Sequence, residues 1–558
     1  MVSQLLNDRN RTTSFIIGSL IAIHVAFGLH TASRKTITHD EIWHLPIGIL
    51  NLQSRDFHFD DLNPPLTRMW AGLPGWLIGP EVESGKGSSD VAGKYIRHHP
   101  GHRTWYVCGR AFNLMLSVAT ILIACRWAYE WFGMSAALMT ALLGCTEPNV
   151  LAHSSLVTPD AGLMLGFTAT LYVLCRWWSQ PTWKLAILTG IITGLTQGTK
   201  FTAILLYAVV VVVGVLAILR PRIADVSRRK ILLQWLTILL FSLIAWNATY
   251  LFRGSGRSLA SYSFQSQSMR TIQGVLKPVE QFPVPLPESY MTGIDRQKSI
   301  MEQQHPVYLD GQWSLHGFRS YFPRTLQYKL SHVLQLLVLV GVVLLLFRRH
   351  RASRIDMLVL LGLPCALLLG IASLSSMQLG VRYVLPLMPL LILIASSVAC
   401  SVTERSPLIK WGLTSIVVVA AFLPLRHHPD HLAYFNEAAG GRIGGRYHLL
   451  DSNLDWGQDL HMVREFMTTN GLDEIGLVYF GTLPPDILGI DYHVSPGRSP
   501  APGWHAVSVN FVMGRPHVVI EPDGTGRPTD INEFGYFRGF EPVTTLGGSI
   551  DIYHIESR

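Results

Sequence analysis

The chain alternates long apolar runs with polar loops, and these runs predict its architecture. A helix needs roughly 17 to 25 mainly apolar residues to cross the hydrocarbon core of a bilayer. By that criterion the sequence holds about eleven candidate spans, near residues 14–33, 107–125, 133–150, 158–178, 184–199, 201–219, 231–252, 328–347, 356–376, 383–403 and 409–425. The pattern therefore predicts a polytopic α-helical membrane protein.

Two segments depart from this alternation. The apolar run Leu66–Ile78 is too short to span and is interrupted by Arg68 and Pro74, so it predicts an interfacial or re-entrant helix. After residue 426 the pattern becomes that of a soluble protein, with a helix expected over 459–469 and strands over 474–481, 505–512 and 517–522. We expect a membrane domain over 1–426 and a soluble α/β domain of about 130 residues over 427–558.

Composition agrees with a membrane location. Of the 558 residues, 49% are hydrophobic and only 15% are charged, and the mean hydropathy is positive. The net charge of +8 does not indicate a nucleic-acid partner, because the basic residues cluster in short loops rather than along one amphipathic face. The six cysteines lie in or beside apolar runs, and they form neither a disulfide framework nor a zinc pattern.

Three basic clusters orient the array. They lie at 9–11, 220–230 and 348–354, and an even number of predicted spans separates each from the next. The positive-inside rule places all three in the cytoplasm. The loops 34–106 and 253–327 and the tail from 427 to 558 are then expected outside a multi-pass protein of the cell membrane. A secretory signal peptide is the alternative for 14–33, but a retained first helix is favoured because it anchors the following loop.

An acidic pair begins the first outward loop. Asp40 and Glu41 lie in T-H-D-E-I-W-H-L, directly after the first apolar run. Carboxylates at a membrane boundary are candidates for a functional site, because burying them unpaired is costly. The alternative is structural, with Asp40 as N-cap and Glu41 in the first turn of a helix. Both interpretations stay open on this stretch alone.

Further charged residues are expected at the outward ends of spans. His153 and Asp160 lie in one short loop, and Lys200 lies in the next. Arg324, Lys329 and Arg382 stand where later spans begin. Asp160 also suits a helix start, and Lys200 could extend to the interface from an apolar position. Cations at three outward ends run against the positive-inside bias, which indicates an anionic partner at the outer leaflet.

The tail carries its own acidic stretch, with Asp451, Asn453, Asp455 and Asp459 in D-S-N-L-D-W-G-Q-D. These residue types could form a site, but they are also usual in turns and N-caps. We favour the structural role for them.

The order of these motifs resembles a known family. The D-E pair, N-P-P-L at 63–66, T-P-D at 158–160, G-T-K-F-T-A at 198–203 and G-V-R-Y-V-L-P at 380–386 are similar to polyprenyl-phosphate-sugar-dependent glycosyltransferases of the GT-C fold. Within it, the chain resembles glycosyltransferase family 39, which contains protein O-mannosyltransferases and aminoarabinose transferases. The resemblance covers about residues 10–425 by motif order, and no single motif is specific.

The resemblance implies roles for these residues. Asp40 matches the catalytic aspartate, with Glu41 and Asp160 as further acidic positions that orient the acceptor and the base. Lys200 and Arg382 would hold the donor phosphate, with Arg324 and Lys329 as weaker candidates. His44, Asn63 and His153 are candidates for positioning substrate. Asn63 stands where some members carry another residue, which leaves the role of N-P-P-L open.

The expected reaction is an inverting transfer from a polyprenyl-phosphate sugar to a hydroxyl of a protein, lipid or glycan on the outer face. A carboxylate base and fixed cations suffice for a monophosphate leaving group, so no cofactor is expected and a divalent metal is not favoured. A transporter and a sensor remain alternatives. A metalloprotease does not fit, because H-D-E-I-W-H places His39 and His44 five residues apart instead of in H-E-x-x-H.

Overall fold

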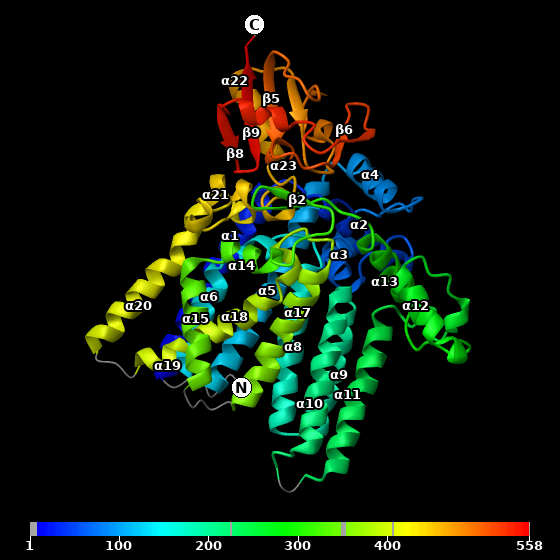
Figure 1. The fold of residues 1–558 in the computed structure, drawn as a ribbon, viewed down its shortest axis with the longest axis vertical. Coiled ribbons are helices and arrows are strands. Elements are labelled where there is room, and N and C mark those ends of the chain that lie inside the picture. The colour runs from blue at the N-terminus through cyan, green and yellow to red at the C-terminus, as the bar shows by residue number, and fades with distance from the viewer. Residues whose placement is uncertain (1–7, 224–225, 348–352, 404–406, 557–558) are drawn as a thin grey trace.

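A computed structural model of the chain describes residues 8–223, 226–347, 353–403 and 407–556. Helices occupy every predicted span, and the tail lies at the far end of the long axis from the loop between α10 and α11 (Figure 1). Part of the basic cluster at 348–354 lies outside the described residues. The main helices are α1 (Asp8–Arg34), α5 (His102–Phe132), α6 (Met134–Thr146), α8 (Asp160–Ser179), α9 (Trp183–Gln197), α10 (Leu206–Leu219), α11 (Arg228–Ala248), α15 (His332–Phe347), α17 (Leu363–Leu374), α18 (Leu387–Ser396), α19 (Val398–Thr403) and α20 (Pro407–Phe422).

The number of unbroken helices long enough to cross a membrane is smaller than the number of apolar runs in the sequence. Among the described residues, five helices are long and apolar enough to cross a membrane, and a sixth crossing results if α14 (Tyr321–Lys329) and α15, bent by 118°, count as one. Several predicted runs are broken into pieces. The run at 133–150 splits between α6 and α7 (Pro148–Ser154), because Pro148 cannot continue the hydrogen-bond ladder. The count of about eleven spans therefore stays a prediction.

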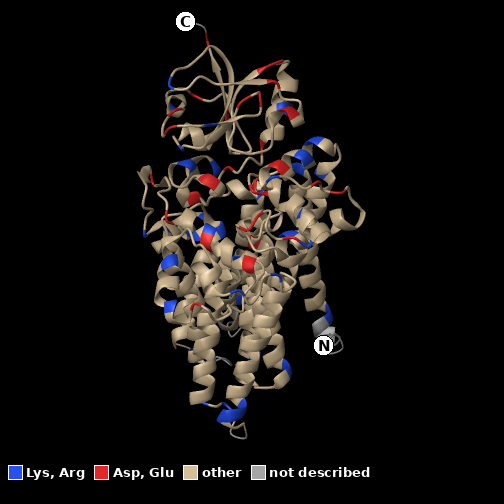
Figure 2. Cartoon of the chain, turned by 90° about the vertical axis from the view of Figure 1, so that its right-hand side faces the viewer, with Lys and Arg blue, Asp and Glu red and all other residues tan. Residues whose placement is uncertain are grey.

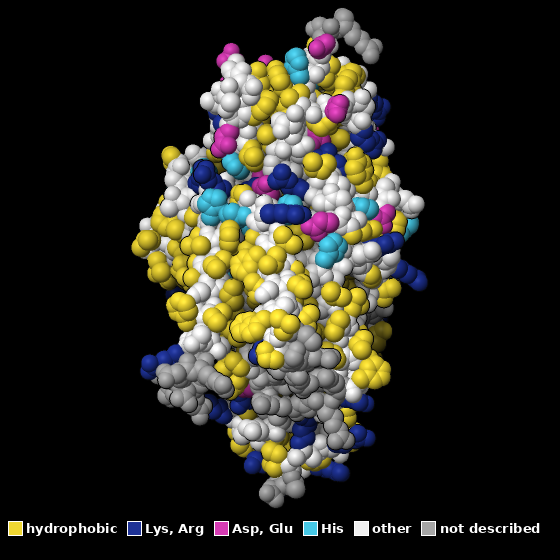
Figure 3. All heavy atoms as spheres, turned by 90° about the vertical axis from the view of Figure 1, so that its left-hand side faces the viewer, with side chains coloured by type: hydrophobic (Ala, Val, Ile, Leu, Met, Phe, Trp, Pro, Cys, Tyr) yellow, Lys and Arg dark blue, Asp and Glu magenta, His cyan; other side chains and the backbone are white. Residues whose placement is uncertain are grey.

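The surface nevertheless has the polarity of a membrane protein. Figure 3 shows a broad belt of hydrophobic side chains across the middle of one face, with histidines and charged groups of both signs above it and Lys and Arg below it. Figure 2 shows that Asp and Glu gather in the upper half and that the lowest tip carries Lys and Arg. The belt marks the face that meets lipid.

The loop 34–106, which is predicted to face outward, forms α2 (Glu41–Ser54), α3 (Leu66–Ile78) and α4 (Ser88–His98). Helices α2 and α3 pack closely, and a Cβ on Gly48 would lie 2.1 Å from the carbonyl oxygen of Arg68. Helix α3 also packs against α5, and its end exposes Trp76, Leu77 and Ile78. The expected short helix is thus present. Its packing fixes α2, the helix that follows Asp40.

The loop 253–327, which is also predicted to face outward, forms η3 (Leu259–Ser261), α12 (Gln267–Val275), η4 (Lys277–Val279), α13 (Glu288–Met301), β1 (Val307–Leu309) and β2 (Gln312–Ser314) before α14. Strands β1 and β2 pair in antiparallel fashion. Shorter elements complete the membrane part: η2 (Phe201–Leu205), α16 (Arg354–Met357), η5 (Leu358–Gly362) and η6 (Val381–Val384).

The tail begins as a series of short helices, from η7 (Leu423–His427) to η11 (Asp451–Asn453), that covers the predicted outward end of the membrane part. Beyond α22 (Leu460–Asn470), a mixed sheet has the strand order β4-β3-β5-β9-β8. Its strands are β3 (Ile475–Val478), β4 (Tyr492–Val494), β5 (Gly503–Ser508), β8 (Thr544–Leu546) and β9 (Ile550–Ile555). Strand β3 is parallel to both of its neighbours, whereas the pairs that involve β9 are antiparallel. The run expected at 505–512 divides into β5 and the short helix α23 (Val509–Val512).

The third run expected in the tail, 517–522, lies outside that sheet. It contributes β6 (Val518–Ile520) to a separate hairpin with β7 (Gly526–Pro528).

The orientation can be tested by labelling. In a cysteine-free background, single cysteines at Ser88 and Thr525 should react with a membrane-impermeant thiol reagent on intact cells, and one at Ser227 should react only after permeabilisation. Thr525 and Ser227 are both exposed on the protein surface. A difference in their labelling would therefore reflect the side of the membrane and not burial in the protein. Labelling of Ser227 on intact cells with protection of the other two would reverse the orientation.

Candidate functional site

Asp40 forms an ion pair with a residue far along the chain. It immediately precedes α2, but its side chain makes no capping hydrogen bond. Instead Nη1 of Arg382, in η6, donates to its carboxylate at 2.6 Å. Burial would raise the pKa of Asp40, but the Arg382 guanidinium lowers it to about 2. Asp40 is therefore ionised at neutral pH, and its carboxylate does not serve as a helix cap.

Glu41 lies in a fully buried clamp. Its two oxygens accept from Nε and Nη2 of Arg110 at 2.8 and 2.6 Å. The backbone N–H groups of Val157 and Thr38 donate to the same carboxylate at 2.7 and 2.9 Å. Burial raises the pKa of Glu41, but Arg110 and these backbone donors lower it below its ordinary value. Glu41 thus joins α2 to α5 and to the loop before α8, and so positions Asp40.

A second acid–cation pair lies beside the first. Asp160 begins α8, and its Oδ1 accepts from Nζ of Lys200 at 2.7 Å. Lys200 and Arg382 lie 5.0 and 5.5 Å from the centre of the same ring, that of Tyr383. Arg382 also interacts electrostatically with Asp160. The structure therefore brings together four residues that the sequence placed at separate outward ends. Tyr383, between the two cations, was not expected.

Buried polar atoms without a protein partner gather around these pairs. They include Nδ1 of His39, His44 and His153, Oδ2 of Asp160, and Nε of Arg382. His44 interacts electrostatically with Asp40 and Asp160, and His153 with Asp160, Lys200 and Arg382. Burial lowers the pKa values of His39 and His44, which favours their neutral forms. Because buried polar groups are rarely left unpaired, this concentration indicates a place where polar groups of a substrate bind.

Three candidates lie elsewhere or have other partners. Arg324 is exposed and faces Asp310 at 3.7 Å. Lys329 is buried, and its Nζ donates to the carbonyl oxygens of Leu432 and Asn453 at 2.9 and 2.7 Å. Among the described residues, the Asp40 carboxylate is paired with Arg382, and Asn63 does not take part in this pair. Lys329 thus fastens α14 to the tail, and neither it nor Arg324 contacts the Asp40–Arg382 pair.

The tail supplies residues that sequence reasoning did not place in the site. The Arg382 guanidinium lies 4.3 Å from the centre of the Trp456 ring, and the Trp456 carbonyl accepts from the N–H of His39 at 2.8 Å. The His39 ring lies 5.0 Å from that of His517 and stacks on Phe480 at 6.0 Å. The signal in the sequence was the dense polar and aromatic stretch 451–459. Residues of this stretch make specific contacts with the membrane part and do not form a solvated turn.

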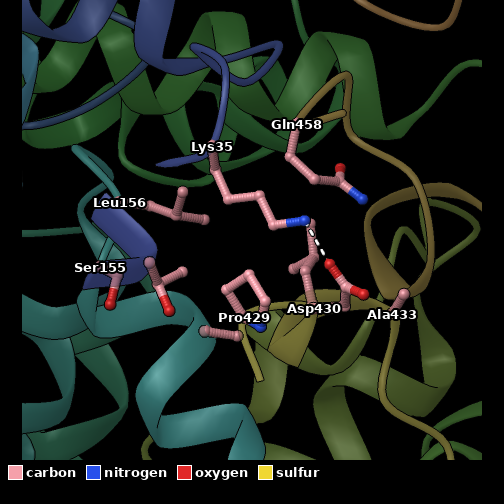
Figure 4. A pocket seen from close by; sticks show the side chains of 10 residues that line it. Lys35, Ser155, Leu156, Pro429, Asp430, Ala433 and Gln458 are labelled. Atoms are coloured by element: carbon pink, nitrogen blue, oxygen red, sulfur yellow. Dashed lines mark hydrogen bonds and ion pairs between the residues drawn. The ribbon is translucent and has the colours of Figure 1, made fainter. Parts of the chain in front are cut away.

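A buried lysine fastens the tail next to this region. Lys35, just after α1, forms ion pairs with Asp430 and Asp459, and Figure 4 shows it reaching toward Asp430. Beside it lies a cavity of about 20 Å³, room for a single water, lined by Thr31, Lys35, Ala152, Ser155, Leu156, Pro429, Asp430, Leu432, Ala433 and Gln458. Asp459 is therefore the partner of a buried lysine, and its side chain does not make the capping hydrogen bond expected at the start of α22. Asp455 is also buried, and burial raises its pKa to about 8, although Ser508 donates to it.

Within the part of the chain that the structure describes, no group of three or more His, Cys, Asp or Glu side chains has the arrangement of a metal site. The groups around Asp40 instead combine carboxylates with fixed cations and neutral imidazoles. Such a set can accept a proton and neutralise an anion in the same place.

Part of the chain is similar to known mannosyltransferases. Residues 13–253 match the family model described as dolichyl-phosphate-mannose-protein mannosyltransferase. Dolichyl-phosphate-mannose–protein mannosyltransferase 4 of Saccharomyces cerevisiae is 26% identical over 162 residues, which are 27% of this chain and 20% of that protein. The chain thus matches about a fifth of the curated relative's length.

Solved structures give weaker matches. ArnT from Cupriavidus metallidurans in the apo state is 17% identical, with a TM-score of 0.46 over 75% of this chain and 65% of that one. The same protein bound to undecaprenyl phosphate is 15% identical, with a TM-score of 0.46 over 77% and 67%. The match over residues 13–253 supports a glycosyltransferase family 39-like membrane protein.

Proposed function

We propose that the protein transfers a sugar from a polyprenyl-phosphate donor to an acceptor hydroxyl on the outer face of the membrane, with inversion at the anomeric carbon. The observation that carries this proposal is the pairing of Asp40 with Arg382 beside Asp160 with Lys200. A base for the hydroxyl and cations for the leaving phosphate then lie in one site. The family domain at residues 13–253 supports a lipid-phosphate donor.

In the proposed reaction the acceptor oxygen attacks the anomeric carbon from the side opposite the phosphate. The bond from that carbon to the phosphate oxygen breaks, and its electron pair leaves with the polyprenyl phosphate. The acceptor proton passes to Asp40. Arg382 and Lys200 offset the charge of the leaving group, and both are held in place before the donor arrives.

Because Asp40 is paired with Arg382, its basicity would depend on whether the donor is bound. While Arg382 is bound to it, Asp40 is a weak base, because the guanidinium lowers its pKa to about 2. A donor phosphate that engages Arg382, for instance through its unpaired Nε, would share that positive charge. The carboxylate would then become more basic when both substrates are present. The pair would therefore limit proton abstraction before the donor has bound.

A direct test is transfer by membranes that contain the protein. With a radiolabelled polyprenyl-phosphate mannose, label should move into protein, lipid or glycan and release polyprenyl phosphate, with membranes lacking the protein as the control. Extraction with organic solvent, followed by protease or glycosidase digestion, identifies the class of acceptor. A sensor would bind the donor without turnover. A transporter would move it across the bilayer without release of polyprenyl phosphate.

We expect catalysis to need no tightly bound divalent metal. A monophosphate leaving group can be neutralised by one or two cationic side chains, whereas a diphosphate commonly requires a metal. Donor turnover by purified enzyme should therefore be unchanged after exhaustive chelation. A loss of activity that manganese or magnesium restores would instead make Asp40 and Asp160 metal ligands.

A further inference from the structure

The segment formed by α12, η4 and the turn after η4 carries an exposed apolar stripe. Ile272, Val275, Val279 and Phe282 follow one another at intervals of three, four and three residues, and their exposed fractions are 47, 73, 45 and 70%. Ile272 and Val275 lie on α12, Val279 ends the 3-10 helix η4, and Phe282 lies in the turn after it. Four large apolar side chains exposed so close together in the sequence indicate an interaction surface.

The stripe belongs to a firmly held segment. Met269, three residues before Ile272 on α12, packs with Leu259, Tyr262, Phe264 and Met291. Gln273 Nε2 donates to the carbonyl oxygens of Leu259 and Tyr262 at 2.9 and 3.0 Å. The Glu302 carboxylate accepts from the backbone of Gln267 and Ser268 at 2.7 and 2.8 Å, at the start of the helix. The exposed stripe is therefore a fixed feature of the fold.

The segment also carries exposed cations. Arg270 lies on α12 and Lys277 on η4, and Glu280 is the nearest acidic side chain along the chain. A segment that is held on its domain and exposes both apolar side chains and cations is typical of one that lies in a membrane interface. Its apolar side chains enter the acyl boundary, and its cations meet lipid phosphates.

The position of α12 fits this occupant. Figure 1 shows α12 at the level of the outward ends of α9 and α11, below the tail. The loop before α13 is bonded to α11, since Asn247 Nδ2 donates to the carbonyl of Pro285 at 3.0 Å. Just after α11, Leu251 and Phe252 are 50 and 55% exposed, and they continue the apolar surface that α11 presents through Leu236, Leu240 and Ile244. The stripe thus lies at the level where the apolar surface of α11 ends.

We propose that α12 and η4 form a membrane-surface anchor, with Ile272, Val275, Val279 and Phe282 inserted into the outer leaflet and with Arg270 and Lys277 at its phosphates. The anchor would hold the second outward loop at the bilayer. It would also fix the first loop, because Arg296 on α13 donates to Asp61 at 3.1 Å. This inference does not depend on the proposed transferase activity.

Spin labels can test the insertion directly. In a cysteine-free protein reconstituted into phosphatidylcholine liposomes, a nitroxide at Val275→Cys should collide more often with oxygen, which concentrates in the acyl region, than with water-soluble nickel chelate. Gly274→Cys is the matched control, because it is adjacent in sequence, about 100° away around the helix, and a Cβ there meets nothing within 4 Å. A nitroxide at this control position should collide more often with the nickel chelate than with oxygen.

Phe282→Cys repeats the measurement at the other end of the stripe and guards against a local defect at residue 275. Size-exclusion elution and melting temperature matched to the parent establish that each variant is folded. If the labels at 275 and 282 meet the nickel chelate as freely as the label at 274, the stripe lies in water and the proposal is wrong. Exclusion of both reagents would show that protein covers the stripe, which also overturns it.

Discussion

Replacement of Asp40 by asparagine is expected to lower sugar transfer by a factor on the order of a hundred or more, because the amide keeps the shape of the carboxylate but cannot take the acceptor proton. Donor binding should be largely retained, since Arg382 and Lys200 remain. The measurement is the initial rate of label transfer per folded, membrane-inserted enzyme. Donor affinity is determined separately.

The chain offers a matched control for this variant. Asp356 forms an ion pair with Arg222, and that guanidinium lies 4.0 Å from the ring centre of Trp178, much as Arg382 lies over Trp456. The basic loop places this pair on the predicted cytoplasmic side. Asp356→Asn therefore breaks a similar pair away from the site and should leave transfer near the parent rate. Equal rates for Asp40→Asn and Asp356→Asn would reduce Asp40 to a structural partner of Arg382.

The second large effect is expected at Arg382. Arg382→Ala removes charge stabilisation from the leaving phosphate, and loss of one such donor commonly lowers the rate by about a hundredfold to a thousandfold. Arg382→Lys should recover only part of the activity, because an ammonium cannot reproduce a two-pronged contact with phosphate oxygens. The loss should appear in the use of the lipid donor, measured as kcat/KM for that substrate.

Arg222→Ala is the corresponding control, and we expect it to use the donor like the parent. Lys200→Ala should resemble Arg382→Ala with a smaller loss, because Lys200 is paired with Asp160 instead of the base. Full activity of both Arg382→Ala and Lys200→Ala would rule out phosphate capture by these cations.

Much of the site could be anticipated because it lies where apolar runs end. Asp40, Asp160, Lys200 and Arg382 each stand next to such a run, and the bilayer requires every run to end at one of its two surfaces. The alternation of sides then predicted that all four face the same way. Local sequence could not predict their partners. The pairing of Asp40 with Arg382 joins residues 342 positions apart.

The sequence by itself thus determined the helical membrane class, the change of composition near residue 426, and the identity of the four charged residues, because hydrophobic length and residue chemistry are local properties. Tertiary structure decided their use. In the folded chain Glu41 pairs with Arg110, and Lys329 donates to backbone carbonyls of the tail. Trp456 lies beside Arg382, and His517 lies beside His39. A buried charged side chain can be catalytic or purely structural, depending on which distant group neutralises its charge. Only the folded chain brings those groups together.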